Sequence, residues 1–179
     1  MIKPEMDDRA VVAIQMGRQP RSTVEVGARC HFELPIVIDV PPILDDGTPF
    51  PTTYWLTCPL ARLRISRIES DGGVSAADAL IAADPELGDA FRAAMERYAT
   101  HRDSLMPDGW EGPRPGGGIA GSQGGVKCLH AQYADTISAN LNPIGANVAV
   151  TIEPLDCTAP CVILSSAGVA RNEAWVEPS

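Results

Sequence analysis

The sequence predicts an α+β fold, in which short strands at both ends of the chain surround a helical middle. Residues 24–40 are rich in β-branched side chains and contain a single proline at a plausible break, which predicts two strands. The middle of the chain carries apolar residues at helical spacing. With 179 residues, of which 45% are hydrophobic, the chain is expected to form a single domain over residues 1–179.

The first predicted helix follows Asp7 and Asp8, and Gly17 and Pro20 end it. Residues 41–53 are dense in proline, glycine and aspartate and are expected to form a loop.

The next predicted helix begins at Pro59, because proline suits the first helical position, and this makes Cys58 its N-cap. Gly72 and Gly73 supply a stop signal for this helix. A further helix is predicted from Ser75, which has Asp78 three residues later in a pattern close to a capping box.

Asp84 and Pro85 predict the start of a longer helix. Its apolar residues at steps of four, four and three predict one buried face: Leu87, Phe91, Met95 and Tyr98.

Residues 106–125 hold eight glycines and three prolines, which indicates a long loop that is either functional or disordered. The segment VKCLHAQYADTISANL then predicts a helix with Leu129, Tyr133 and Ile137 facing inward. In ANVAVTIE, Val148, Val150 and Ile152 alternate as in a strand, and CVILSS is a short buried run.

The composition excludes several classes of partner. A net charge of −9 leaves no excess of Lys and Arg for binding a nucleic-acid backbone or an anionic membrane surface. There is no apolar leader segment near the first residues and no run of about 18 apolar residues. The five cysteines are an odd number and widely spread, which favours free thiols in a reducing compartment, so a cytoplasmic location is expected.

Two glycine-rich patterns fail as nucleotide-binding motifs. Gly116, Gly118 and Gly121 match a dinucleotide fingerprint in spacing, but prolines precede them where a strand is required. Lys127 lies between Val126 and Cys128, so the segment is not a phosphate-binding P-loop.

Cys58 and Cys128 both stand at predicted helix starts, where unpaired N–H groups and the helix dipole favour a thiolate. A thiolate there suits a nucleophile or a metal ligand, whereas a free cysteine is also often a buried core residue. Cys128 and His130 are two residues apart, so they reach the same side only if the segment starts in an extended conformation. Cys157 and Cys161 are near ligand spacing but have no second close pair, and no role is assigned to them.

Three segments of the chain carry a resemblance to a known family: RCHFELPIVIDVPPILDDGTPFPTTYWLTCPLARLRISRIESDGG, GGVKCLHAQYAD and NPIG. With them the chain resembles a bacterial family, called domain of unknown function 501, that is frequent in actinobacteria. The resemblance covers about residues 9–150 and leaves residues 154–179 as a C-terminal extension. Members of this family are often encoded near a septum-formation initiator and an exopolyphosphatase.

The resemblance implies a shared site of three thiols and one imidazole, which fall here on Cys30, Cys58, Cys128 and His130. Such a set is typical of structural zinc, and the same soft ligands suit an iron–sulfur cluster. The sequence departs from the family pattern at Glu33, where glycine is expected, and at Gln132, where a second histidine is common.

Three functions remain open. The first is a metal-stabilised binding or regulatory module with an unknown protein or small-molecule partner. The second is a thiol-dependent enzyme acting on a small anion, with Cys58 or Cys128 as nucleophile and His130 as base. In that enzyme the anion is expected to be held by Arg29, Arg62 and Lys127. The third is a scaffold protein whose cysteines are buried and bind no cofactor.

Overall fold

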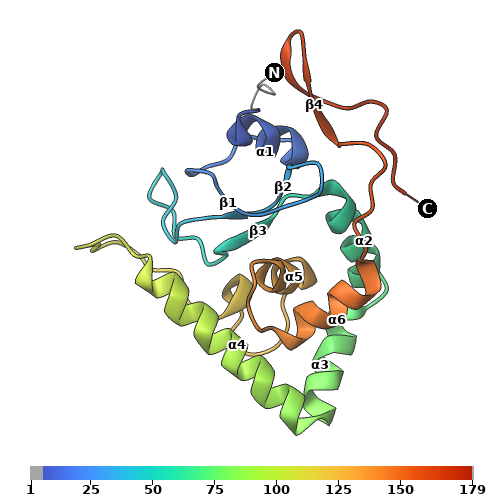
Figure 1. Cartoon of the computed structure of the whole chain (residues 1–179). Coiled ribbons are helices and arrows are strands. Elements are labelled where there is room, and N and C mark those ends of the chain that lie inside the picture. Colours follow the sequence, from blue (N-terminus) through green and yellow to red (C-terminus); the bar gives the residue numbers. More distant parts are fainter. Residues whose placement is uncertain (1–5, 179) are drawn as a thin grey trace.

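A three-stranded antiparallel sheet separates the first helix from the remaining helices (Figure 1). The computed structural model describes residues 6–178. Its elements are α1 (Asp8–Met16), β1 (Glu25–Arg29), β2 (Pro35–Asp39), β3 (Tyr54–Leu56), α2 (Pro59–Ser70), α3 (Gly73–Ala83), α4 (Pro85–Ser104), the 3₁₀ turn η1 (Ile119–Gly121), α5 (Leu129–Ile137), α6 (Pro143–Ile152), β4 (Val162–Ser165) and β5 (Gly168–Arg171). The α+β class is therefore confirmed.

The central strand β2 sends alternate side chains to two separate cores. Ile38 packs with Val12 of α1 on one face of the sheet. Its neighbour Val37 packs on the other face, in the larger core with the remaining helices. This alternation follows from the two-residue period of a strand. A second sheet, the β4–β5 hairpin, packs against α1.

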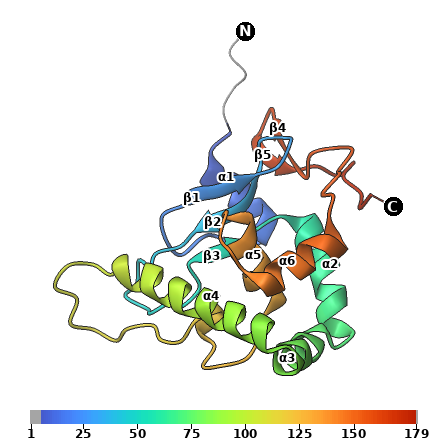
Figure 2. The same cartoon turned by 60° about the horizontal axis from the view of Figure 1, so that its bottom comes forward.

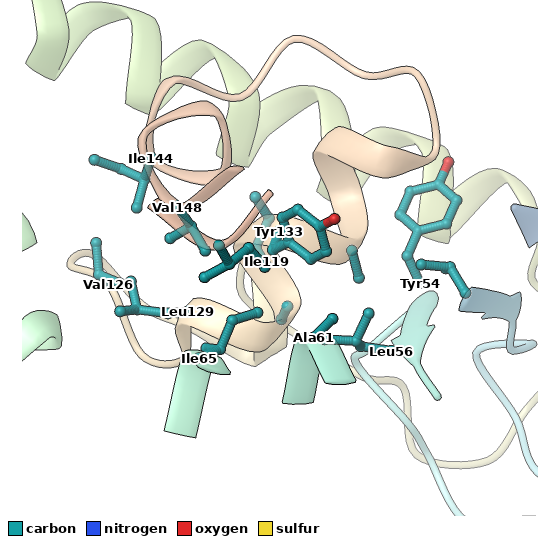
Figure 3. Packing of buried hydrophobic residues seen from close by; sticks show 14 of the residues in the cluster. Tyr54, Leu56, Ala61, Ile65, Ile119, Val126, Leu129, Tyr133, Ile144 and Val148 are labelled. Carbon is teal, nitrogen blue, oxygen red and sulfur yellow. The ribbon is translucent and has the colours of Figure 1, made fainter. Parts of the chain in front are cut away.

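Helix α5 lies at the centre of the larger core. It packs against α6, β3 and α2, and Tyr133 is fully buried among apolar side chains (Figure 3). Helices α2, α3 and α4 run around it, as Figures 1 and 2 show. Helix α6 approaches α5 closely, since a Cβ atom on Gly145 would lie 2.1 Å from the carbonyl oxygen of Gln132. Only glycine fits there.

Several predicted boundaries are confirmed. Asp7 caps α1 with its carboxylate, and Gly17 ends that helix in the left-handed conformation. Residues 24–40 form β1 and β2. Cys58 is the N-cap of α2 and Asp84 caps α4, each followed by proline at the first helical position.

The predicted strand over residues 146–153 is wrong, because residues 146–152 belong to helix α6 and Glu153 is its C-cap. The side chain of Asn142 accepts hydrogen bonds from the backbone N–H groups of Ile144 and Gly145 and so caps the helix. Val148 and Ile152 are buried at helical spacing, whereas Val150 is 86% exposed. The alternation of apolar residues was therefore coincidental.

The predicted helix start at Ser75 is also displaced. Helix α3 begins at Gly73, after Gly72 turns the chain with a φ of 87°. Asp78 does not cap this helix; its carboxylate accepts a hydrogen bond from the backbone N–H of Val126.

The glycine-rich loop has two parts with different surroundings. Residues 107–109 and 111–114 are exposed, and in both views this part extends away from the helices (Figures 1 and 2). Residues 116–122 are held against α4. The buried guanidinium group of Arg102 donates to the carbonyl oxygens of Gly116 and Gly117, and the N–H of Ile119 contacts the sulfur of Met95.

Limited proteolysis with a glutamyl endopeptidase is expected to cut first after Glu111. This residue lies in the exposed half of the loop, where the backbone is free to enter a protease. Mass spectrometry of the first fragments identifies the site. A first cut after Glu86 or Glu96, both within α4, would contradict this description of the loop.

Tyr98→Phe is expected to destabilise the protein by about 1–3 kcal/mol, the cost of an unsatisfied buried donor. The Tyr98 hydroxyl is fully buried and accepts hydrogen bonds from the backbone N–H groups of Thr53, at 2.6 Å, and Tyr54, at 3.4 Å. Urea unfolding measures the change. Arg92→Gln on the exposed face of the same helix is the control and should change stability by no more than about 0.5 kcal/mol. Equal stability of the two variants would show that the hydroxyl contributes nothing.

Candidate functional site

Two carboxylates hold the segment that leads into α5. Asp78 of α3 accepts from the backbone N–H of Val126 at 2.7 Å. Glu69 of α2 accepts from the backbone N–H of Leu129 at 2.6 Å, so it occupies one of the unpaired donors at the start of α5. The position of this helix start is therefore fixed by α2 and α3.

Cys128 is the N-cap of α5 and its backbone is extended, with a φ of −158° and a ψ of 121°. The extended residue turns the Cys128 side chain to the side on which His130 lies, and the distance from its Sγ to Nδ1 of His130 is 3.8 Å. The spacing of these two residues predicted that they reach the same side only if the segment starts in an extended conformation, and the structure confirms this.

The imidazole of His130 faces α2 through both of its nitrogens. Its Nε2 lies 3.2 Å from the carbonyl oxygen of Arg62 and 3.3 Å from Oγ of Ser66. A carbonyl oxygen only accepts, so Nε2 carries the proton and donates. In a neutral imidazole the lone pair is then on Nδ1. That nitrogen faces Oε1 of Glu69 at 3.2 Å and Sγ of Cys128.

Three electron-pair donors thus converge on one volume. Within residues 6–178, Glu69, Cys128 and His130 form the one group of His, Cys, Asp or Glu residues whose ligand atoms all lie within 4.8 Å of one another. Two lone pairs and a carboxylate repel each other unless a cation or a proton lies between them.

Two of the three distances between donor atoms are close to the edges of a tetrahedral zinc site. With Zn–S near 2.3 Å and Zn–N and Zn–O near 2.0–2.1 Å, a tetrahedron requires about 3.6 Å between sulfur and nitrogen and about 3.3 Å between nitrogen and oxygen. The corresponding distances here are 3.8 Å and 3.2 Å. The half-buried Glu69 and His130 side chains, 27% and 23% exposed, therefore need little movement to bind an ion.

Burial and the adjacent Glu69 charge raise the pKa of the Cys128 thiol. A neutral thiol at neutral pH is a weak nucleophile and a weak ligand. A bound divalent ion would remove the proton, since a coordinating thiol is deprotonated outright.

The site lies at the wall of a cavity of about 750 Å³ between β3, α2 and α5. Cys128 and His130 both line it, together with Arg62 and Arg18. The guanidinium carbon of Arg18 is 5.6 Å from the ring centre of Trp55, in a cation–π arrangement. The remaining wall is mostly apolar and includes Leu56, Pro59, Leu63, Ala120 and Ala131.

The structure divides the predicted set of four ligands between two places. Cys128 and His130 come together with Glu69, whereas Cys30 and Cys58 line a different, smaller cavity near the N-terminus of α2. Cys58 is 8% exposed, and burial raises its pKa to about 11. The helix start does favour its thiolate, through the N–H groups of Leu60 and Ala61, but burial outweighs this effect.

Of the three predicted anion-binding residues, Arg62 alone lines the cavity. Arg29 forms a two-point ion pair with Asp8 and donates to the carbonyl oxygen of Glu33. Lys127 is exposed and does not line the cavity.

Glu69 was missed by the sequence reasoning. It stands on the same face of α2 as Arg62 and Ser66, at steps of four and three residues, and all three contact His130. That spacing was visible in the sequence, but nothing in it indicated that this face meets the start of α5.

Residues 26–150 match the model of the family described as "Protein of unknown function (DUF501)". The match covers well over half of the chain, so the chain belongs to this family. Glu69, Cys128 and His130 all lie within the matched region, whereas Cys157 and Cys161 lie beyond it. The comparisons with curated proteins and with solved structures found no match. None of the helices in residues 6–178 is both long and apolar enough to cross a membrane.

In metal-free protein, Cys58 is expected to react with iodoacetamide much more slowly than Cys128. The alkylating reagent requires a thiolate and access, and the buried Cys58 thiol, with a pKa of about 11, has neither. Cys128 lies at the wall of the large cavity. Peptide mass spectrometry after chelator treatment measures both rates, and urea-unfolded protein is the control in which they should converge. Faster labelling of Cys58 would contradict this assignment.

Proposed function

We propose that this protein is a metal-dependent binding module, in which Glu69, Cys128 and His130 hold one divalent ion that binds a small anionic ligand in the adjacent cavity. The expected ion is zinc, and the expected location is the cytoplasm, whose reducing conditions keep the five free thiols available.

The observation that carries the proposal is the orientation of His130. Its Nε2 lies against the carbonyl oxygen of Arg62, which only accepts, and its Nδ1 lies against the carboxylate of Glu69 and the sulfur of Cys128. In the neutral ring, Nδ1 therefore offers its lone pair to an ion held between these groups. An imidazole whose second nitrogen donates to a backbone carbonyl is the usual arrangement of a metal-ligating histidine.

The donor set favours zinc over an iron–sulfur cluster at this place. Zinc accepts sulfur, nitrogen and carboxylate oxygen together, and clusters are held mainly by several thiolates. Cys128 is the only thiol among the three ligands. Three protein ligands leave a fourth position of the tetrahedron for water or for an atom of a bound molecule.

The cavity indicates the class of ligand. Two arginines, Arg18 and Arg62, line it, and a guanidinium group pairs well with a carboxylate or phosphate group. The ring of Trp55 and the aliphatic wall suit an apolar body attached to that group. A small organic anion with an apolar portion satisfies both features.

A thiol-dependent enzyme has less support. Burial raises the pKa of both candidate nucleophiles, Cys58 and Cys128. Glu69 and Cys128 also both face Nδ1 of His130. In a catalytic triad, the nucleophile and the carboxylate contact opposite nitrogens of the histidine.

Zinc binding tests the metal part of the proposal. His130→Gln is expected to lower the zinc content of purified protein by one ion per chain. It should weaken zinc binding at this site more than about 100-fold, because loss of a residue that only hydrogen-bonds a ligand already lowers metal affinity 10- to 100-fold. His101→Gln is the matched control, since His101 stacks on Tyr54 outside the site and should leave zinc content unchanged. Equal zinc content in wild type and His130→Gln would refute the proposal.

The ligand part is tested with cobalt in place of zinc and inorganic phosphate as the probe. Phosphate is expected to change the visible spectrum of the cobalt-loaded protein, and Arg18→Gln is expected to raise the phosphate concentration needed about tenfold, as for loss of one charged hydrogen bond. Arg21→Gln is the control, because Arg21 pairs with Asp46 at the surface. If the spectrum does not respond to phosphate or to benzoate, the cavity does not bind small anions at the metal.

A further inference from the structure

A second cavity, on the other side of the α2 N-terminus, is lined by four cysteines from three parts of the chain. Cys30 comes from the turn after β1, Cys58 caps α2, and Cys157 and Cys161 come from the segment after α6. The cavity has a volume of about 20 Å³. A space of this size holds about one water-sized body, so it admits a single ion and not a multi-iron cluster.

Two of the four sulfurs receive hydrogen bonds from side-chain N–H groups. The amide of Gln15 donates to Cys161 at 3.7 Å, and the indole N–H of Trp175 donates to Cys157 at 3.4 Å.

These donors are a second observation, independent of the clustering of the thiols. N–H groups directed at sulfur stabilise a thiolate, and donors of this kind surround the ligands of metal–thiolate sites.

We propose that Cys30, Cys58, Cys157 and Cys161 bind one zinc ion as a structural site, separate from the Glu69–Cys128–His130 site. Four thiolates in a tetrahedron are a standard set for structural zinc. This inference does not rest on the proposed function, because the two sites share no residue.

Binding draws the sulfurs together. Within residues 6–178, no three of these four sulfur atoms lie within 4.8 Å of one another, whereas the sulfurs of a tetrahedral zinc site are about 3.8 Å apart. Two of the ligands, Cys157 and Cys161, belong to the C-terminal segment. His31, in the turn after β1, already contacts this segment at the carbonyl oxygen of Cys157. Zinc would therefore fasten this segment to α2 and to the turn after β1.

The two sites differ in their number of thiolates, and this difference makes them separable. Wild-type protein is expected to hold two zinc ions per chain, and Cys157→Ser/Cys161→Ser and His130→Gln are each expected to hold one. With cobalt in place of zinc, the thiolate-to-cobalt charge-transfer absorption should fall strongly in the double serine variant and slightly in His130→Gln. A double serine variant that keeps the zinc content and the charge-transfer absorption of wild type overturns the four-cysteine site. Loss of one zinc in the serine variant but none in His130→Gln overturns the proposed function alone.

A measurement on wild-type protein covers the case in which the double variant does not fold. Cys157 and Cys161 are expected to be protected from iodoacetamide in the zinc-loaded protein and to be labelled after treatment with a chelator. Glutamyl endopeptidase should then cut more readily after Glu173, within the loosened segment. Equal labelling of both cysteines with and without the chelator overturns the four-cysteine site.

Discussion

The extended backbone at Cys128 is the constraint on which the candidate metal site depends. A helix that began one turn earlier would place Cys128 and His130 on different faces. Glu69 prevents this, because its carboxylate accepts the N–H of Leu129 and fixes where α5 begins. The same carboxylate faces Nδ1 of His130. One side chain thus sets the local backbone and contributes to the donor set.

Helix α2 organises both cavities. Its outer face supplies the carbonyl of Arg62, the hydroxyl of Ser66 and the carboxylate of Glu69 to His130. Its N-terminus carries Cys58 into the second cavity. With ions in both places, the helix would be fastened to α5 at one point and to the C-terminal segment at another. Such cross-links suit a chain whose main sheet has only three short strands.

The sequence predicted local features better than long-range ones. The helix starts at Asp7–Asp8, Cys58 and Asp84 follow from residue types within a few positions, and the structure confirms them. The helix predicted over residues 126–141 is shorter: α5 covers Leu129–Ile137, with Cys128 as its N-cap. Helix α6 was missed although Asn142 and Pro143 form a standard helix start, because three alternating apolar residues favoured a strand. Cys128 and His130 were predicted as ligands from their family pattern, but their partner Glu69 is fixed by the packing of α2 on α5. Cys30 and Cys58 were grouped with them because the family pattern contains all four residues, but they line a different cavity. A family pattern does not show which of its residues lie together in space.

The protonation state of His130 in zinc-loaded protein shows whether its Nδ1 binds the ion. Long-range nitrogen–proton correlation spectra of protein labelled in its three histidines, with His130 assigned from the His130→Gln variant, report the state of each ring nitrogen. We expect a proton on Nε2 and a metal-shifted, unprotonated Nδ1. Protons on both nitrogens of His130 in the presence of zinc would contradict it, because His130 would then be an imidazolium paired with Glu69 and not a ligand.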